Sequence, residues 1–557
     1  MTHTTYTGGY YSLKAKLVKT GIHKHTSALE DPVSDTMLAA VNAVQKTRWR
    51  VNPFILEVMS SAFHNGDHIA GLPPAEDAPL PPALSEETWL SMTDEQRAEH
   101  KLELSRIHGD NARRRGKREA AGRKLALARD LVDQPVIYFP HALDFRGRAY
   151  PLPQDLTPQG DDVSKSLLMF ADGKPCGLAG MRWLLIALAN AAGQDKLSFD
   201  DRVQWVKDND AQIVQSVADP LEYRWWASEE FDSPWVFLAL AQEYINADRY
   251  GPALYPCHVP VHIDATCSGI QHLSALGRDP IGGRATNLIN TGKREDLYTE
   301  VAENVKVRVA NDAVKANTVA QAWAGNVKRT TVKRAVMTTP YGVTENGIRD
   351  QLIADKHCEG LEGSRRENAN YLKDVIVDAL ESTVVSAKEI MGYFQDVARA
   401  LGTKNIPLTW QTPAGMKVRQ SYFRLSHSQI RTLYGKVSLW DEQESQGLEV
   451  RDQALAAAPN VVHSLDSAHL ALTVVAARDD GIEHFALIHD SYGTHACNVE
   501  RLGKILREEF VKMYSGDWLE VFERQVQEYA ESIELPPRPR QGTLDLTQVL
   551  DSPYFFS

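Results

Sequence analysis

Helix-forming residues dominate the pattern of hydrophobic and polar positions along this chain. Strong helix formers run without proline from about Thr93 to Asp130, and further helices are predicted at 177–192, 234–248, 294–312, 367–401 and 499–533. Short apolar runs predict strands at 136–140, 259–265 and 484–489, the last followed by a returning strand at 494–498. We therefore expect a mostly helical chain with a few short strands.

Composition narrows the class of protein. A chain of 557 residues exceeds what one hydrophobic core usually supports, so three or four subdomains are expected. Its 43% hydrophobic and 24% charged residues are typical of soluble globular proteins, and its apolar runs are too short to span a bilayer. The five cysteines are widely spaced without a CxxC pair, which predicts neither a disulfide framework nor a zinc site.

Charge is unevenly distributed along the chain. The net charge of −12 by itself argues against a nucleic-acid partner. Residues 101–130, however, hold ten Lys and Arg against four Asp and Glu, and residues 313–344 hold no acid at all. This distribution predicts a basic channel in an acidic shell, although a solvated helix face at 101–130 is an equal alternative. Residues 1–29 share a lack of acids with organelle transit peptides but also lack arginine, so a transit peptide is not expected.

The first segment with candidate chemistry is VPVHIDATCSGIQHLSAL, residues 259–276. An apolar strand ends in Asp264, a turn of small residues follows, and a helix is predicted from about Ile270. A carboxylate beside the free carbonyls of a strand end suits a hard cation such as Mg²⁺. Aspartate is also a common turn residue, so this position alone does not decide between a ligand and a turn.

The second segment is KRTTVKRAVMTTPYG, residues 328–342. Four residues recur at intervals of four, which places them along one side of a helix: Arg329, Lys333, Met337 and Tyr341. Two cations, an apolar group and an aromatic ring in line suit a triphosphate at one end and a base and sugar at the other, although a solvated basic face is the ordinary alternative. Pro340 and Gly342 predict that the helix kinks or ends here.

The third segment is FALIHDSYGTHACN, residues 485–498, which predicts a hairpin with Asp490 at its tip and Gly493 completing the turn. Asp264 and Asp490 lie 226 residues apart, so only the fold could bring them together. Two carboxylates beside a phosphate-binding cationic helix would make a two-metal site for phosphoryl transfer. The cofactor expected there is a pair of Mg²⁺ ions.

These three segments, in this order, resemble motifs A, B and C of the single-subunit RNA polymerases of the bacteriophage T7 type, which include mitochondrial enzymes. Further segments look like family signatures over nearly the whole chain: DFRGRAYPLP (144–153), TPQGDDVSKSLL (157–168), PLEYRWWASEEFDSPWVFLALAQEY (220–244), APNVVHSLDSAHL (458–470) and the terminal TLDLTQVLDSPYFFS. The resemblance implies a DNA-directed RNA polymerase, a nucleotidyltransferase that adds ribonucleotides to an RNA 3′ end by two-metal phosphoryl transfer.

The resemblance also assigns roles to single residues. Both Mg²⁺ ions would be held by Asp264, Ala265 and Asp490. The incoming triphosphate would contact Arg329, Lys333 and Arg334. The ribose and the new base pair would be sensed by Tyr341, Gly342 and His463. Template and product strands would lie against Arg146, Arg148 and Lys165. Lys333 and Tyr341 would act with the two aspartates as the catalytic set.

The implied fold is α+β, a right hand whose small antiparallel sheet lies in the palm. Residues 1–135 would form a helical thumb, 173–254 an insertion in the palm and 282–463 the fingers, and the palm would comprise 136–172, 255–281 and 464–557. We expect the family's N-terminal promoter-binding domain to be missing before the thumb, and the specificity hairpin at 422–450 looks shortened. We therefore expect promoter recognition to be reduced or altered.

The nearest alternative is a DNA polymerase of the related A family. Such enzymes carry a glutamate at the position of Gly269, usually an aromatic residue at the position of Met337, and His-Asp-Glu where this chain reads His-Asp-Ser. These differences favour ribonucleotides as substrates. A primase-like enzyme also stays open, and a non-catalytic DNA-binding module is the least expected alternative, because each metal ligand of the family is present.

The expected partners follow from this interpretation. They are a DNA template, an RNA product and ribonucleoside triphosphates, with an auxiliary protein for initiation as an open alternative. We expect a monomer without membrane association. The expected location is the cytoplasm, that of a phage-infected bacterium.

Overall fold

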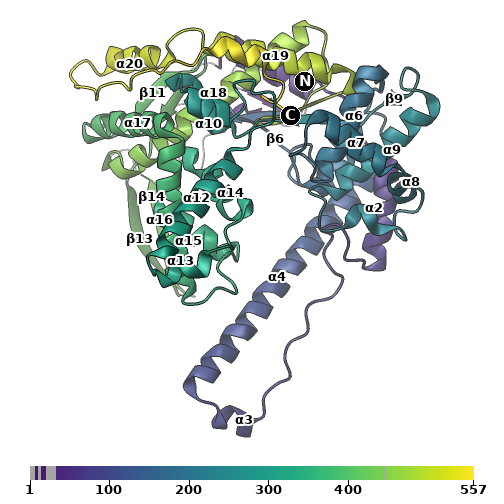
Figure 1. Ribbon diagram of the computed structural model, residues 1–557, viewed down its shortest axis with the longest axis horizontal. Helices are drawn as coiled ribbons and strands as arrows, with labels where there is room; N and C mark the ends of the chain where they lie inside the picture. The colour runs from purple at the N-terminus through teal and green to yellow at the C-terminus, as the bar shows by residue number, and fades with distance from the viewer. Residues whose placement is uncertain (1–6, 10–13, 20–32, 434, 443–445) are drawn as a thin grey trace.

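The computed structural model describes residues 7–9, 14–19, 33–433, 435–442 and 446–557. Two helical lobes lie on either side of the molecule and are joined by a layer that contains the C-terminal helices (Figure 1). A single long helix projects away from both lobes. Most of residues 1–29, considered above for a transit peptide, fall outside the described ranges.

A three-stranded antiparallel sheet lies in the joining layer. Its order is β10 (Val261–Asp264), β16 (Ser491–Thr494) and β15 (Ala486–Ile488). Asp264 faces Ser491 across the first pair. On the other side of β10, Asp264 exchanges two backbone hydrogen bonds with Ser557, with N···O distances of 3.0 and 3.4 Å. Segments that are far apart in the sequence therefore meet at the end of β10.

Three helices border this sheet: α10 (Ser268–Gly277), α18 (Val450–Asp479) and α19 (Val499–Met513). α19 buries one face, with Leu502, Leu506 and Phe510 at helical spacing, because these side chains close the hydrophobic core over the sheet. α18 is buried along much of its length and packs against both α17 (Val385–Thr403) and α1 (Asp35–Gln45). The core thus continues from the sheet into one lobe.

The first lobe contains α6 (Gly177–Ala191), α7 (Phe199–Asp208), α8 (Asp210–Ala218) and α9 (Pro234–Tyr250). α7 begins where the Ser198 side chain accepts the Asp201 N–H, and α9 begins with a proline, which needs no hydrogen-bond partner at that position. Asp162 of α5 (Asp162–Ser166) accepts two N–H groups from the first turn of α9. This contact fixes the lobe to the segment before it.

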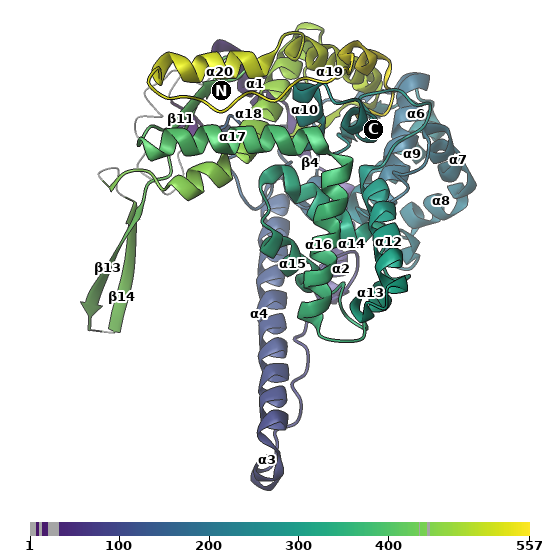
Figure 2. The same ribbon diagram turned by 60° about the vertical axis from the view of Figure 1, so that its left-hand side comes forward.

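The second lobe contains the helices that follow β10 and α10 in sequence. They are α12 (Leu297–Val314), α13 (Thr318–Trp323), α14 (Arg329–Thr338), the 3₁₀ turn η3 (Thr339–Tyr341), α15 (Glu345–Ala354), α16 (Arg365–Thr383) and α17. Beyond α17, the hairpin of β13 (Leu425–Thr432) and β14 (Gly435–Glu442) extends from the body as an exposed ribbon (Figure 2).

The projecting helix is α4 (Asp94–Leu131), preceded by the short α3 (Glu86–Ser91) at its tip. Thr93 and Gln96 form a reciprocal cap at its start. The chain reaches this tip from α2 (Pro53–Asn65) through an extended connection. The Asn111 side chain of α4 bonds to the backbone of Ala78 in this connection. The base of α4 packs on α2 and β4 (Trp49–Val51).

The remaining elements are short. Helical segments are α11 (Pro280–Ala285), α20 (Trp518–Tyr529), η2 (Arg224–Ala227), η5 (Ala496–Asn498) and η6 (Leu546–Asp551). Paired strands are β1 (Thr7–Gly9) with β2 (Lys14–Lys16), β3 (Val18–Lys19) with β5 (His141–Asp144) and β6 (Ala149–Pro151), β4 with β7 (Leu168–Phe170), β8 (Lys174–Pro175) with β9 (Pro256–Cys257), and β11 (Leu408–Gln411) with β12 (Lys417–Gln420). Within the described residues, no helix has the length and apolarity needed to cross a membrane.

The predicted α+β class, mostly helical with a small antiparallel sheet, is confirmed. The long helix near 93–130 is present, and α14 ends before Pro340, with Gly342 at a φ of +74° closing the turn. The predicted helices at 367–401 and 499–533 are each two helices, because the chain turns at Val384 and again between Met513 and Trp518.

Two strand predictions are wrong. Residues 136–140 form no strand, and β5 begins only at His141. In the hairpin, His489 and Asp490 form the turn, and Gly493 lies inside β16 rather than in the turn. A side chain at Gly493 would place its Cβ 2.7 Å from the His262 ring and 2.8 Å from the Ala486 carbonyl oxygen. This glycine therefore permits close strand packing, and the predicted strand at 494–498 is largely the turn η5.

Candidate active site

Both aspartates singled out from the sequence line one cavity of about 530 Å³. Asp264 is the last residue of β10, and Asp490 lies in the turn before β16. The backbones meet directly, because the Ala265 N–H donates to the Asp490 carbonyl oxygen at 3.2 Å. The side chain of Asp490 accepts a hydrogen bond of 2.9 Å from the Ser268 hydroxyl. The fold thus brings two carboxylates together from opposite ends of the motif series.

Backbone strain accompanies this arrangement. His489, directly before Asp490, has a φ of +53°, and Cys267, at the start of α10, has a φ of +63°. Residues with a side chain rarely adopt this left-handed region, which costs about 1–2 kcal/mol per residue. Both turns are held by the strands and helix beside them, so the strain is fixed where the carboxylates are presented to the cavity.

Burial has the largest effect on the pKa of each of the two carboxylates. Asp264 is exposed to the cavity but surrounded by protein, which raises the pKa of its carboxyl. Burial raises the pKa of Asp490 to about 6, and the negative charges of Asp466 and Asp264 act in the same direction. Neither forms an ion pair with any residue that the structure describes. Two neighbouring carboxylates without a direct ion pair are the environment that a divalent cation would neutralise.

The ligand set offered by the protein is partial. The described part of the chain contains no cluster of three or more His, Cys, Asp or Glu side chains suited to a metal ion. Two carboxylates and the neighbouring Ala265, which also lines the cavity, are what the fold supplies. Mg²⁺ often keeps water and substrate phosphates among its ligands and needs only one or two carboxylates, so these residues fit such an ion.

α14 supplies the cationic side of the same cavity. Arg329, Lys333 and Met337 all line it, as the spacing of four predicted. Lys333 is exposed, and Arg329 forms an ion pair with Asp296 at the start of α12. Arg334 points elsewhere, because it pairs with Asp355 at 2.6 Å and does not line the cavity. Its assignment to the triphosphate stays a prediction.

Tyr341 and His463 lie together beyond the end of α14. Their rings are stacked at a tilt, with centroids 4.5 Å apart. A Cβ at Gly269 would lie 2.8 Å from the Cβ of Pro340 and 3.4 Å from the Tyr341 hydroxyl. Gly269 therefore allows the close approach of Pro340 in the turn before Tyr341, and the positive φ of Gly342 lets the chain turn directly after the tyrosine.

The two arginines of DFRGR are held in place by acids. Arg146 bonds to Asp144 and donates to Nδ1 of His463 at 2.7 Å. Burial and the positive charges of the two arginines lower the pKa of His463 to about 3, so its ring is neutral and can accept this bond. Arg148 bonds to Asp466, a buried residue of α18, at 2.6 Å. These contacts connect β5–β6 to the helix that carries His463.

Lys165 lies on α5 and lines the cavity beside Asp264. Its positive charge acts to lower the pKa of that carboxyl, although burial outweighs it. The structure thus places Lys165 with the two aspartates. The assignment of this lysine to the template or product strand stays a prediction.

Several cavity residues were missed by the sequence analysis. They come from the loop before α7 and from the segment that leads into α12: Asp195, Lys196, Arg294, Asp296 and Tyr298. They show no spacing that marks a site, and only the packing of the two lobes on the sheet reveals them. The charged run KRED at 293–296, at the start of the helix predicted at 294–312, was the one available signal.

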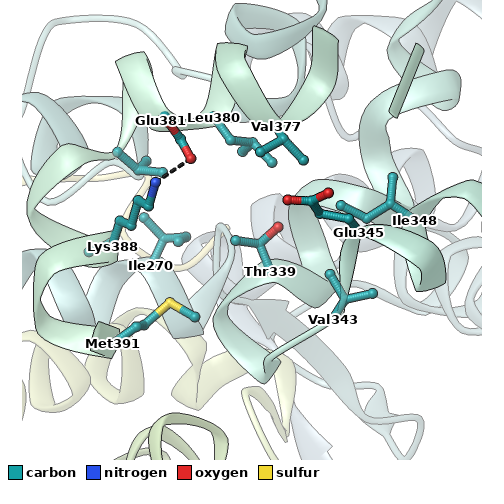
Figure 3. A pocket seen from close by; sticks show the side chains of 12 residues that line it. Ile270, Thr339, Val343, Glu345, Ile348, Val377, Leu380, Glu381, Lys388 and Met391 are labelled. Carbon is teal, nitrogen blue, oxygen red and sulfur yellow. Dashed lines mark hydrogen bonds and ion pairs between the residues drawn. The ribbon is translucent and has the colours of Figure 1, made fainter. Parts of the chain in front are cut away.

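A second cavity, of about 150 Å³, lies behind η3 between α15, α16 and α17 (Figure 3). Its lining is mainly aliphatic and includes Ile270, Leu380 and Met391. A Glu381–Lys388 ion pair lies at one side. It offers no group of carboxylates and cations like that of the larger cavity, so the chemistry belongs to the latter.

Comparison with known proteins agrees with this geometry. Residues 174–533 match the sequence model of a family described as DNA-dependent RNA polymerase. The chain belongs to this family. The family assignment confirms the resemblance seen in motifs A, B and C and decides against the A-family DNA polymerases as its group.

Among curated proteins, the chain is similar to plant enzymes. It is 36% identical to DNA-directed RNA polymerase 3, chloroplastic, of Nicotiana sylvestris, over 99% of this chain and 57% of that protein. It is 36% identical to DNA-directed RNA polymerase 2, chloroplastic/mitochondrial, of Arabidopsis thaliana, over 99% of this chain and 55% of that protein. The chain spans about half the length of the curated relatives it matches.

A solved structure with weaker likeness is the POL domain of Pol1 from M. smegmatis in complex with DNA primer-template and dNTP. It superposes with a TM-score of 0.42 and 12% identity, over 88% of this chain and 68% of that one.

The expected location is wrong. We expected the cytoplasm of a phage-infected bacterium, but the similar curated proteins are named as chloroplastic or mitochondrial. The resemblance to bacteriophage enzymes therefore does not predict the location named for these relatives.

Proposed function

We propose that this chain is a DNA-directed RNA polymerase that extends an RNA 3′ end with ribonucleotides by two-metal phosphoryl transfer. One observation carries the proposal: Asp264, Asp490 and the cations of α14 line a single cavity, although 226 residues separate the two carboxylates. Acids that can hold cations on one side and positive side chains on the other are what phosphoryl transfer from a triphosphate requires.

Two Mg²⁺ ions are the proposed cofactor, held by the carboxylates of Asp264 and Asp490 and the carbonyl of Ala265. Bound there, such ions activate the primer hydroxyl and neutralise charge on the reacting phosphate. The protein's own part is positional. The β10–β16 register and the strained turn at His489 fix the two carboxylates, so that no rearrangement of the strands is needed when substrate binds.

We propose that Arg329 and Lys333 bind the triphosphate, since both line the cavity on the side of α14. Tyr341 and His463 then face the ribose and the new base pair. Gly269 supports a ribonucleotide substrate, because this chain lacks the glutamate that A-family DNA polymerases carry at this position. The neutral ring of His463, held by Arg146, presents its other nitrogen as a donor.

Nucleic acid is proposed to lie against Arg146, Arg148 and the basic helix α4. We assign α4 and the residues up to 135 to the thumb, 173–254 to the palm insertion and 282–463 to the fingers, with the palm in 136–172, 255–281 and 464–557. The exposed β13–β14 hairpin is the candidate for contacts with promoter DNA. We propose that promoter recognition is reduced or altered, because the specificity segment at 422–450 looks shortened in sequence.

Primer extension on a preformed RNA/DNA hybrid tests the proposal, because it needs no promoter. We expect wild type to incorporate the four ribonucleotides with Mg²⁺, and Asp490→Asn to lower the rate by roughly a thousandfold or more, because one metal-binding charge is lost. Asp480→Asn is the matched control, since Asp480 pairs with Arg501 outside the cavity. Equal rates for wild type and Asp490→Asn would show the assignment to be wrong.

A further inference from the structure

Positive and negative side chains are evenly matched in the catalytic cavity. Five cations line it, namely Lys165, Lys196, Arg294, Arg329 and Lys333, and so do five carboxylates, namely Asp195, Asp232, Asp264, Asp296 and Asp490. Two of these carboxylates are the proposed metal ligands. The other three lower the positive potential that a triphosphate would meet, which is an unexpected property for a polyanion-binding site.

Asp296 pairs with Arg329, one of the two cations proposed to bind the triphosphate. Its two carboxylate oxygens accept from Nε and Nη2 of Arg329 at 2.5 and 3.1 Å. This two-bond geometry is the one that guanidinium groups also form with phosphate. The Arg329 guanidinium lies 5.0 Å from the ring of Tyr298, which supports it from one face. Arg329 is thus already occupied by an anion of the protein.

The local structure keeps Asp296 ready to form this pair. It lies directly before α12, but its side chain makes no capping hydrogen bond to the helix and instead accepts the Thr299 hydroxyl at 2.5 Å. Burial would raise the pKa of Asp296, but the hydrogen bonds from Arg329 and Thr299 lower it below its ordinary value, so the carboxylate is charged at neutral pH. Its remaining exposure is small, with 16% of the side chain accessible.

We propose that Asp296 is a positioning residue that competes with the substrate triphosphate for Arg329 and takes this arginine back when pyrophosphate leaves. Binding breaks the two Asp296–Arg329 hydrogen bonds and forms Arg329–phosphate bonds, and product release reverses the exchange. This inference rests on the proposed function. It predicts that the wild-type enzyme binds triphosphate and pyrophosphate less tightly than the same site would without the Asp296 charge. For the same reason, the wild-type enzyme releases pyrophosphate faster.

Asp296→Asn tests the exchange, because it removes the charge and keeps the shape. We expect inhibition by added pyrophosphate to strengthen roughly tenfold and the KM for ribonucleotides to fall, as one charge-assisted pair no longer competes. We expect kcat to fall as pyrophosphate release slows. A residue with a merely structural role would give the opposite change in affinity, since a less ordered Arg329 binds phosphate more weakly.

The matched control is Glu300→Gln on the same helix, since Glu300 pairs with Arg284 at 2.7 Å and does not line the cavity. It should leave both constants unchanged. Asp296→Ser, which also carries a side chain favoured before a helix, repeats the test if the asparagine variant unfolds.

The outcomes separate the two proposals. Wild type without ribonucleotide incorporation would overturn the proposed function itself. An active wild type together with an Asp296→Asn variant of unchanged or weaker pyrophosphate inhibition would overturn only the exchange.

Discussion

At the scale of single residues, the site depends on what is absent as much as on what is present. Gly269 has no side chain, and a Cβ there would lie 2.8 Å from the Cβ of Pro340, the residue directly before Tyr341. The tyrosine is in turn fixed by its stack on His463. Burial raises the pKa of the Tyr341 hydroxyl above its ordinary value, so this group stays protonated and can donate to a ribose oxygen.

Removal of this hydroxyl should weaken discrimination between ribose and deoxyribose. We expect Tyr341→Phe to lower the rNTP/dNTP selectivity by roughly tenfold, because one polar contact is lost while the ring stack remains. The measurement is the ratio of kcat/KM values in single-nucleotide extension. Tyr371→Phe is the control, since the Tyr371 hydroxyl bonds to Asp312 outside the cavity. Unchanged selectivity in the Tyr341 variant would remove that residue from the role.

Site residues within the sequence motifs could be predicted, whereas site residues that reach the cavity only through the packing of distant segments could not. Asp264, Asp490, Arg329 and Lys333 were found from strand ends, spacing and the family resemblance, and the structure brings all four to one cavity. Asp296 and Lys196 carried no such signal, because each lies in a loop whose position depends on the packing of a whole lobe. Asp466 was missed for a similar reason, since its partner Arg148 lies 318 residues away.

At the scale of elements, the end of α14 was predicted correctly from proline and glycine, whereas the turn of the hairpin was not. Pro340 and Gly342 predicted the end of α14 because both act through their own backbone. Gly493 was misplaced because glycine serves close strand packing as well as turns. The subdomain boundary proposed at 463/464 falls inside α18, a continuous helix, so the proposed fingers and palm would share this element.

The basic cluster on α4 is partly engaged by the protein itself. Arg118 pairs with Asp77 of the returning connection at 2.7 Å, and Arg115 lies 3.5 Å from the same carboxylate. Lys117 is exposed and is free of such a pair among the described residues. The cluster thus combines cations that hold the connection with cations available to a phosphate backbone.

Neutralisation of the available cations distinguishes a helix that binds nucleic acid from a basic helix face that is only solvated. We expect the double change Arg114→Gln and Lys117→Gln to reduce the slope of log Kd against log salt for an RNA/DNA hybrid by up to about 2, because each lost phosphate contact means about one counterion fewer released on binding. Binding titrations at several salt concentrations measure it. Lys207→Gln on α7 is the control. An unchanged slope would favour a solvated helix face.

At the scale of the whole molecule, stability should depend on a buried acid of the first lobe. Glu243 of α9 is buried and accepts the His258 N–H, and burial raises its pKa from 4.5 to about 7. Its neutral form is therefore favoured in the folded protein. The stability that this group contributes is complete below about pH 4.5 and is lost as pH rises through about 7.

Glu243→Gln should remove this dependence while keeping a hydrogen-bond acceptor. At pH 8 we expect the variant to be more stable than wild type by about 3 kcal/mol, with the difference vanishing below pH 4.5. Denaturant unfolding at several pH values measures it. The exposed Glu229→Gln serves as the control. A stability difference that does not vary with pH would contradict the prediction.

The projecting helix also has a mechanical consequence. Its buried apolar residues, Ala121, Leu125 and Ala128, all lie in its last third, so the preceding turns extend from the body like a lever. From Ala121 to Asp94 the arm is about 40 Å long. A rotation of roughly 5° at the base therefore moves the tip by roughly 3.5 Å, close to the ~3.4 Å step between stacked nucleotides. A small change in how the base of α4 packs against α2 is therefore enough to displace the tip by about one such step.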